Sequence, residues 1–209
     1  MNAPNRTRMP AFDARRRRLM ATAAALPLIK LPFAASLADD APAQERGIRG
    51  QFAPELDVEF WLDAEGEPTT FQLADHAGKW VHIKCWQHWC PGCHKHGFPA
   101  LQKFVEAFPD DSQLVNVGIQ TTFEGHWFND ESKVRKTQLR YDLPIVMGHD
   151  PGKRNDHGYP NTMVSYRTGG TPWHIIISPD GRVVFNGFNI DADRAIAFIR
   201  EHIDKAQTG

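Results

Sequence analysis

Residues 80–93 read WVHIKCWQHWCPGC, an apolar run typical of a strand that ends in two cysteines three positions apart. Four apolar residues downstream recur at i, i+3, i+4 and i+7: Leu101, Phe104, Val105 and Phe108. This period predicts a helix from about Pro91 to Phe108, so Cys90 and Cys93 stand at its N-terminus. Backbone N–H groups and the helix dipole favour a thiolate there. We therefore expect the pKa of Cys90 to lie below the value of about 8.5 of a free thiol.

The rest of the chain alternates strand-like and helical patterns. Extended segments are expected near Val58–Leu62 and Thr70–Leu73, and strands at Trp80–Cys85, Leu114–Ile119, Pro144–Met147, Trp173–Ile177 and Val183–Phe185. Two further helices are expected at Glu131–Tyr141 and Asp193–Lys205. This order predicts an α/β fold in which a central mixed sheet carries helices on both faces and an N-terminal extended extension.

The N-terminal part of the chain is predicted to direct export. Arg15–Arg18 precede an apolar run from Leu19 to Leu37. Ser36-Leu37-Ala38 resembles a signal-peptide cleavage site, which has small residues on either side of a variable one. We interpret residues 1–38 as an export signal of the twin-arginine or the Sec type, although an uncleaved membrane anchor remains an alternative because the run is about as long as a spanning helix. Residues 39–47 then form a linker and residues 48–206 one domain, outside the cytoplasm in either case.

Charge and cysteine content narrow the function classes. Without residues 1–38 the chain keeps 17 basic and 24 acidic residues, so its net charge is about −7 and a nucleic-acid partner is not expected. Three cysteines are too few for a disulfide framework. A four-cysteine zinc site is excluded by the same count, and a reversible disulfide explains the Cys90–Cys93 pair better than an inert crosslink.

Four motifs together resemble the exported thioredoxin-fold proteins of the TlpA/ResA type. They are Trp86–Cys93, Phe98-Pro99, Gly169–Pro172 before an apolar strand, and Ser178–Gly181. The resemblance covers about residues 48–206 and implies a thioredoxin fold and thiol–disulfide exchange with protein substrates in the periplasm. It implies that Cys90 is the exposed attacking thiol, that Cys93 resolves the mixed disulfide, and that Thr171-Pro172 is a cis peptide facing them. No cofactor besides the redox-active disulfide is expected.

The cis peptide and the residue before the first cysteine are the candidates for substrate binding. A cis proline turns the backbone of Thr171 outward, where an extended substrate could add as a strand, and Pro172 itself has no N–H to donate. Trp89 stands directly before the attacking thiol and is the aromatic residue best placed to touch a partner.

Lys84 departs from the family pattern, which has an Asp or Asn six residues before the first cysteine. If Lys84 points toward the thiols, its charge stabilises the thiolate, or its neutral form serves as a base. The alternative is that its ammonium group reaches the surface. Cys85, which stands where the family usually has Phe, is expected to be a buried and inert thiol, with a third redox thiol as the alternative.

Three histidines surround the motif: His88, His94 and His96. His88 and His94 are candidates for tuning the pKa of the thiols. His94 and His96 point to nearly opposite sides of a helix, so no metal site is predicted. A copper-binding assembly factor remains an alternative function. So does a thiol peroxidase, although Gln87 stands where peroxidases carry Thr or Ser.

The direction of electron flow does not follow from the motif. The resemblance favours a reductant that receives electrons from a membrane donor and acts in cytochrome c or copper-site maturation. The dithiol chemistry itself follows from Cys90 and Cys93 alone.

Overall fold

The computed structural model describes residues 46–110, 112–152 and 158–208. These residues form a seven-stranded sheet in the order β2-β1-β5-β4-β3-β6-β7. The strands are β1 (Phe60–Leu62), β2 (Pro68–Thr69), β3 (Trp80–Trp86), β4 (Leu114–Thr121), β5 (Val146–Asp150), β6 (Trp173–Ile177) and β7 (Val183–Gly187). The expected export signal and residues 39–45 of the expected linker lie outside the described residues. Within those residues, no helix is long and apolar enough to cross a membrane.

The strand β3 lies inside the sheet and confirms the strand expected before the cysteines. It pairs parallel with β4 and antiparallel with β6, and all seven of its residues are buried. β4 in turn pairs parallel with β5, so the sheet is mixed, as expected. Because successive side chains of a strand point to opposite faces, His82, Lys84 and Trp86 share one face and Val81, Ile83 and Cys85 the other.

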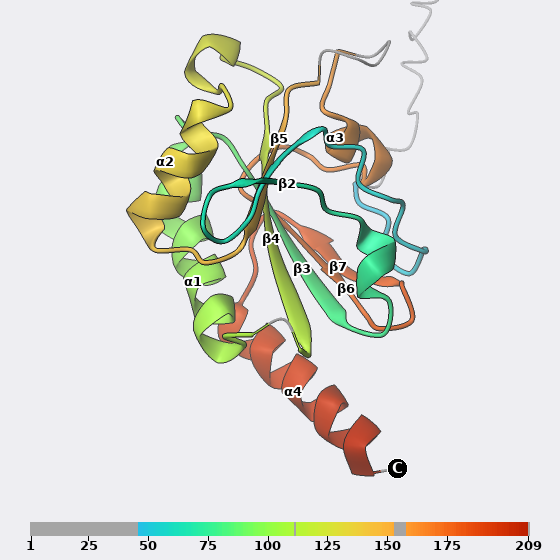
Figure 1. Cartoon of the computed structure of the whole chain (residues 1–209). Coiled ribbons are helices and arrows are strands. Elements are labelled where there is room, and N and C mark those ends of the chain that lie inside the picture. Colours follow the sequence, from blue (N-terminus) through green and yellow to red (C-terminus); the bar gives the residue numbers. More distant parts are fainter. Residues whose placement is uncertain (1–45, 111, 153–157, 209) are drawn as a thin grey trace, which may run out of the picture. The chain divides into compact units, whose positions relative to one another are not determined.

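Helices cover both faces of the sheet, as Figure 1 shows. They are α1 (Phe98–Ala107), α2 (Ser132–Tyr141), α3 (Asn161–Ser165) and α4 (Ala192–Thr208). Buried residues of α1, α2 and α4 pack on the face that carries Trp80 and Trp86. The opposite face packs against Tyr166, at the end of α3, and against apolar residues of the extended segment between Ile48 and Phe71. The expected α/β layering is confirmed.

The helix expected from Pro91 to Phe108 begins at Pro91, as predicted, but it is not α-helical throughout. Cys93–Gly97 form a π-helical segment, and the α-helical part α1 starts at Phe98. π-Helical turns are rare and often lie at functional sites. Cys93 is the first residue of this segment and is fully buried.

Two short helices replace what the sequence pattern indicated as extended or irregular chain. Thr70–Leu73 was expected to be extended, but β2 ends at Thr69 and a 3-10 helix runs from Leu73 to His76. The Glu55 carboxylate accepts hydrogen bonds from the Leu73 and Ala74 N–H groups, at 2.6 and 3.1 Å. A residue 18 positions away thus starts this helix, which no local pattern reveals.

The helix α3 was not predicted and begins in the same way. The Asp150 carboxylate, at the end of β5, accepts hydrogen bonds from the N–H groups of Asn161 and Thr162 at 3.1 and 2.8 Å.

The domain begins earlier than predicted. Arg46 and Gly47 were expected to belong to the linker, but both form hydrogen bonds with the domain. Arg46 Nη1 donates to the Gly169 carbonyl at 2.8 Å, and the Gly47 N–H donates to the Arg167 carbonyl at 2.9 Å.

Candidate active site

The two cysteines lie where the chain passes from β3 into the π-helical segment. The Cys93 N–H donates to the Cys90 sulfur at 3.2 Å, and the Cys90 thiol donates to the Thr171 carbonyl at 3.7 Å. All three cysteines are free thiols in this structure. Cys90 therefore sits between the Cys93 amide on one side and the strand connection at Thr171 on the other.

The Thr171-Pro172 peptide is cis, as the resemblance implied. It packs closely against the dithiol segment, because a Cβ added to Gly92 would lie 3.2 Å from Pro172 Cδ. Glycine between the cysteines thus allows the proline ring to approach. This contact brings the end of the loop before β6 onto the CPGC turn.

Cys90 is less exposed than expected. Only 6% of its surface is accessible, and Cys93 is fully buried. Cys90 packs in an apolar cluster with Trp86 and Phe98, and the Thr171 carbonyl contacts its sulfur. Cys90 is thus more accessible than Cys93, as expected, but it is a largely buried thiol rather than a surface one.

The two thiols differ in acidity. Hydrogen bonding with Cys93, together with Thr171 and the charge of Lys84, outweighs burial and lowers the pKa of Cys90 to about 5. Burial, followed by the hydrogen bond to Cys90, raises the pKa of Cys93. One proton is thus shared unequally, which makes Cys90 the thiolate of the pair. The direction agrees with the expectation for Cys90, although contacts of its sulfur, and not the helix dipole alone, cause it.

Lys84 is fully buried, so the surface alternative is wrong. Its ammonium group donates to the Cys85 carbonyl at 3.0 Å and lies 6.0 Å from the centre of the Phe98 ring. Burial lowers the pKa of Lys84, while the charge of the thiols, Cys93 first, opposes that shift. The side chain therefore lies on the same side of the sheet as the dithiol and interacts with it.

Next to Lys84, three buried polar side chains form a chain of hydrogen bonds that the sequence analysis missed. His82 Nδ1 lies 3.0 Å from Asn116 Oδ1, and His82 Nε2 lies 3.0 Å from His174 Nδ1. Burial lowers the pKa of His82 to about 4 and that of His174 well below its usual value. Both imidazoles are therefore neutral at pH 7. No sequence signal revealed the pair, because 92 positions separate the two histidines.

Cys85 lies on the opposite face of the sheet from the dithiol. It is fully buried in the core with Ile83 and Ile119, and burial raises the pKa of Cys85 to about 12. These surroundings suit the expected role as a small apolar residue with an unreactive sulfur.

His88 and His94 contact each other and α2 instead of the thiols. The His94 ring lies 2.6 Å from the Tyr141 hydroxyl through Nδ1 and 2.6 Å from the His88 carbonyl through Nε2. The main influences on Cys90 are Cys93, Thr171 and Lys84, so a role of either histidine in tuning the thiols stays a prediction. In the part of the chain that the structure describes, no group of three His, Cys, Asp or Glu side chains is arranged to hold a metal ion.

Asn129, which the sequence analysis did not single out, connects the loop after β4 to the segment before Cys90. Its Oδ1 accepts from the His88 N–H at 2.7 Å, and its Nδ2 donates to the Gly125 carbonyl at 3.0 Å. Gln87 Oε1 accepts from Trp89 Nε1 at 2.8 Å and from Asn129 Nδ2 at 3.4 Å. Asn129 thus holds residues 87–89 and the loop of residues 122–131 together.

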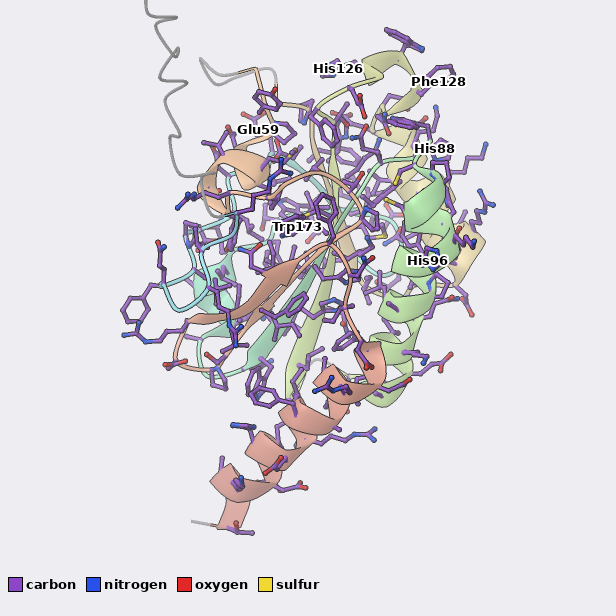
Figure 2. The ribbon with its side chains drawn as sticks, turned by 180° about the vertical axis from the view of Figure 1, so that it is seen from behind. Glu59, His88, His96, His126, Phe128 and Trp173 are labelled. Atoms are coloured by element: carbon purple, nitrogen blue, oxygen red, sulfur yellow. The ribbon has the colours of Figure 1, made fainter. Side chains whose placement is uncertain are left out.

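Three aromatic side chains at this end of the domain are exposed: Trp89 by 44%, Trp127 by 78% and Phe128 by 55%. We call them the aromatic rim. Figure 2 shows Phe128 and His126 at the same end of the domain as His88, beyond the start of the helix that carries His96. A Cβ added to Gly125 would lie 3.2 Å from Trp89 Nε1, so the loop with Trp127 packs on Trp89. The rim therefore borders the entrance to Cys90.

Comparison with known proteins agrees with this geometry. The model of the AhpC/TSA family matches residues 49–186. A thioredoxin-like superfamily protein of known structure is 31% identical, with a TM-score of 0.62, over 71% of this chain and 95% of the other. A thiol-disulfide isomerase from Corynebacterium glutamicum is 27% identical, with a TM-score of 0.63, over 73% and 95% of the two chains.

A secreted disulfide oxidoreductase from Mycobacterium tuberculosis has the same fold, at 20% identity and a TM-score of 0.50, over 68% and 95% of the two chains. Comparison with curated proteins finds no match.

Proposed function

This chain belongs to the AhpC/TSA family and is a thioredoxin-like redox enzyme, and from that premise we propose that it exchanges disulfides with protein substrates through Cys90 and Cys93. The observation that carries the proposal is the position of the Cys90 sulfur. It receives the Cys93 N–H at 3.2 Å and lies 3.7 Å from the carbonyl of Thr171, next to a cis proline. The N–H of Cys93 stabilises a thiolate at Cys90, and burial keeps Cys93 itself a protonated thiol beside it.

The reaction then has two steps. In the reductive direction, the Cys90 thiolate attacks one sulfur of a substrate disulfide, an S–S bond forms to Cys90, and the other substrate sulfur leaves as a thiolate. Cys93 gives its proton to the substrate thiolate formed in the first step and attacks the Cys90 sulfur. The second substrate sulfur leaves, and a Cys90–Cys93 disulfide remains. Since Cys93 is held beside Cys90, this second step competes well against any thiol in solution.

We propose that Trp89, Thr171 and Pro172 bind the substrate. Because only 6% of Cys90 is accessible, a reacting disulfide must lie in an extended and accessible segment to reach its sulfur. The Thr171 backbone contacts this sulfur, and a bound segment could pair with it as an added strand. The aromatic rim offers exposed rings that suit apolar side chains flanking the reacting cysteine.

We place the protein in the periplasm, with electrons supplied by a membrane donor and passed to cysteines of cytochrome c or copper-site partners. The export signal expected at residues 1–38 and the likeness to a secreted oxidoreductase support the compartment. The resemblance to TlpA/ResA-type proteins supports the reductive direction. A positive charge on the buried Lys84 stabilises the reduced pair and raises its reduction potential, so we expect a weaker reductant than a pair without that lysine.

The thiol peroxidase alternative has one observation in its favour, the match to the AhpC/TSA family. At the place of the usual Thr or Ser hydroxyl, Gln87 Oε1 accepts hydrogen bonds from Trp89 and Asn129. A peroxide bound near Cys90 therefore lacks that hydroxyl donor, which favours disulfide exchange.

A trapping experiment tests the proposed function. Cys93→Ser should accumulate mixed disulfides between Cys90 and substrate proteins in a periplasmic extract, whereas Cys90→Ser should accumulate none. The reduction potential of the wild-type pair gives the direction: a value of about −270 mV indicates a thioredoxin-like reductant and about −120 mV an oxidant. Turnover of hydrogen peroxide at a rate above that of disulfide exchange would replace the proposal by the peroxidase.

A further inference from the structure

Lys84 is a buried lysine that no carboxylate of the described residues pairs with. Its side chain is fully buried, and its ammonium group donates a hydrogen bond to the Cys85 carbonyl at 3.0 Å. Among the ion pairs of residues 46–110, 112–152 and 158–208, none joins a carboxylate to Lys84. A charged ammonium group in such surroundings is costly unless an opposite charge is close.

The elements packed around Lys84 offer no counter-charge except thiolates. On β3 itself the neighbours on the same face are His82 and Trp86, and on β6 the residue directly opposite is His174. On β4 the opposite residue is Gly118, which has no side chain.

Both imidazoles are neutral, because they are joined to each other and to Asn116 by hydrogen bonds and are buried. Toward α1, Lys84 faces Gly97, Phe98 and the thiols of Cys90 and Cys93.

The charge of the dithiol changes with its redox state. The reduced pair carries a thiolate at Cys90, whereas a Cys90–Cys93 disulfide carries no charge. The Cys85 thiol also lies near Lys84 but keeps its proton, because burial raises the pKa of Cys85 to about 12. Among the described residues, the negative charge that balances Lys84 therefore comes from the dithiol and is present only after reduction.

We propose that Lys84 takes up a proton when the Cys90–Cys93 disulfide is reduced and gives it up when the dithiol is oxidised. This inference rests on the proposed disulfide exchange at Cys90 and Cys93. It assigns to Lys84 the role of a proton store coupled to electron transfer.

The balance of the reaction needs no further reactant. A donor dithiol supplies two electrons and two protons and becomes a disulfide. The Cys90–Cys93 bond breaks, one proton goes to Cys93, the other goes to neutral Lys84, and Cys90 remains a thiolate paired with the new ammonium group. Oxidation by a substrate disulfide reverses these steps, so the substrate leaves with both protons on its thiols.

The pH dependence of the redox equilibrium tests the proposal. The protein is equilibrated with dithiothreitol, whose two thiols stay protonated between about pH 6 and about pH 7.5. Dithiothreitol loses two protons when it is oxidised. If the reduced protein takes up both of them, no net proton is released, and the equilibrium constant should change less than about twofold over this range. In Lys84→Met only Cys93 takes up a proton once the pH lies well above the pKa of Cys90, so in that range the equilibrium shifts toward the reduced protein about tenfold per pH unit, which is about 30 mV for two electrons.

Lys95→Met is the matched control, since Lys95 is an exposed lysine two residues after Cys93. It should keep the flat profile of the wild type. Thiolate absorbance in the ultraviolet, recorded on the reduced wild type at about pH 6, must show that Cys90 is ionised. A flat profile with an ionised Cys90 requires a second proton acceptor even if Lys84→Met does not fold.

Two results overturn the inference while leaving disulfide exchange intact: a tenfold slope in the wild type, or a flat profile in folded Lys84→Met. Failure of the proposed function looks different, because then no Cys90–Cys93 disulfide forms even with an excess of a strong thiol oxidant such as diamide.

Discussion

Lys84 fills the space that a side chain at Gly97 would need. A Cβ added to Gly97 would lie 2.5 Å from Lys84 Nζ and 3.0 Å from Pro172 Cβ. Lys84 of β3 and the cis proline Pro172 therefore both pack against Gly97, the last residue of the π-helical segment. Replacement of Lys84, Gly97 or Pro172 should disturb the dithiol.

Gly97→Ala should lower the free energy of unfolding by about 1–3 kcal/mol, because the methyl group overpacks the site. Urea unfolding of the reduced protein measures the loss. In a Lys84→Ala background the same substitution should cost less than half as much, since the lysine end is gone. Equal costs in the two backgrounds would show that Lys84 and Gly97 do not compete for this space.

Alkylation should label Cys90 alone, and the labelling rate should fall only when the pH is lowered toward 5. Since the pKa of Cys90 is lowered to about 5, the thiolate is fully present above about pH 6 and is lost as the pH falls through 5. The rate at which iodoacetamide labels Cys90 should therefore not change with pH above about pH 6, whereas the rate for a free thiol keeps rising up to its own pKa of about 8.5. Cys85 and Cys93 should stay unlabelled in the native protein, as mass spectrometry of peptides would show.

Lys84→Met should raise the pKa of Cys90, by about one pH unit, because a nearby positive charge favours the thiolate. Ultraviolet absorbance of the thiolate during a pH titration measures the shift. An unchanged titration curve in the folded variant would mean that Lys84 does not act on Cys90.

The buried histidines should make the protein less stable in acid. The pKa of His82 is lowered to about 4, so between pH 6.5 and 4 the unfolded chain binds a proton that the folded chain does not. Stability from this group is complete above about pH 6.5 and falls by about 3 kcal/mol as the pH drops to about 4.

His82→Leu should remove this part of the pH dependence, although the variant is less stable at pH 7 because Asn116 and His174 lose a partner. His96→Gln, at an exposed position, serves as the control and should keep the wild-type slope. The measurement is urea unfolding at a series of pH values.

Asn129→Ala should loosen the entrance to the dithiol. The substitution leaves the His88 N–H without its acceptor, and we expect a loss of about 1–3 kcal/mol in unfolding free energy. Hydrogen exchange at the amides of residues 87–90 should become faster, whereas Asn189→Ala, at an exposed position, should change neither. Unchanged exchange in Asn129→Ala would show that the loop of residues 122–131 does not hold this segment.

Periodicity predicted the elements whose own residues provide their packing. The strands β3, β4 and β6 and the helix α4 lie within a few residues of their expected bounds, because each buries apolar residues at the spacing of its own secondary structure. The helix α2 also lies close to its expected bounds, although two of its three buried residues, Thr137 and Gln138, are polar. The 3-10 helix at Leu73 and the helix α3 were not predicted. They begin at the carboxylates of Glu55 and Asp150, which are distant in sequence.

In the candidate active site, too, features carried by adjacent residues were predicted and contacts between distant residues were not. The cysteine spacing and the Thr171-Pro172 motif were readable from local sequence, and the cis peptide was expected from the resemblance. The His82–His174 pair and the contacts of Asn129 were not, because each joins residues from separate strands or loops.

The CPGC motif by itself determined that this protein carries a reactive dithiol at the start of a helix, because spacing and helix position suffice for that chemistry. Only the tertiary structure decided the surroundings of that dithiol. It placed Lys84 inside, against Gly97 and without a carboxylate within the described part of the chain, where sequence alone allowed either the surface or the thiols. The physical reason is that burial and counter-charge are properties of the packed neighbours from β4, β6 and the π-helical segment, and no residue's own position in the sequence contains them.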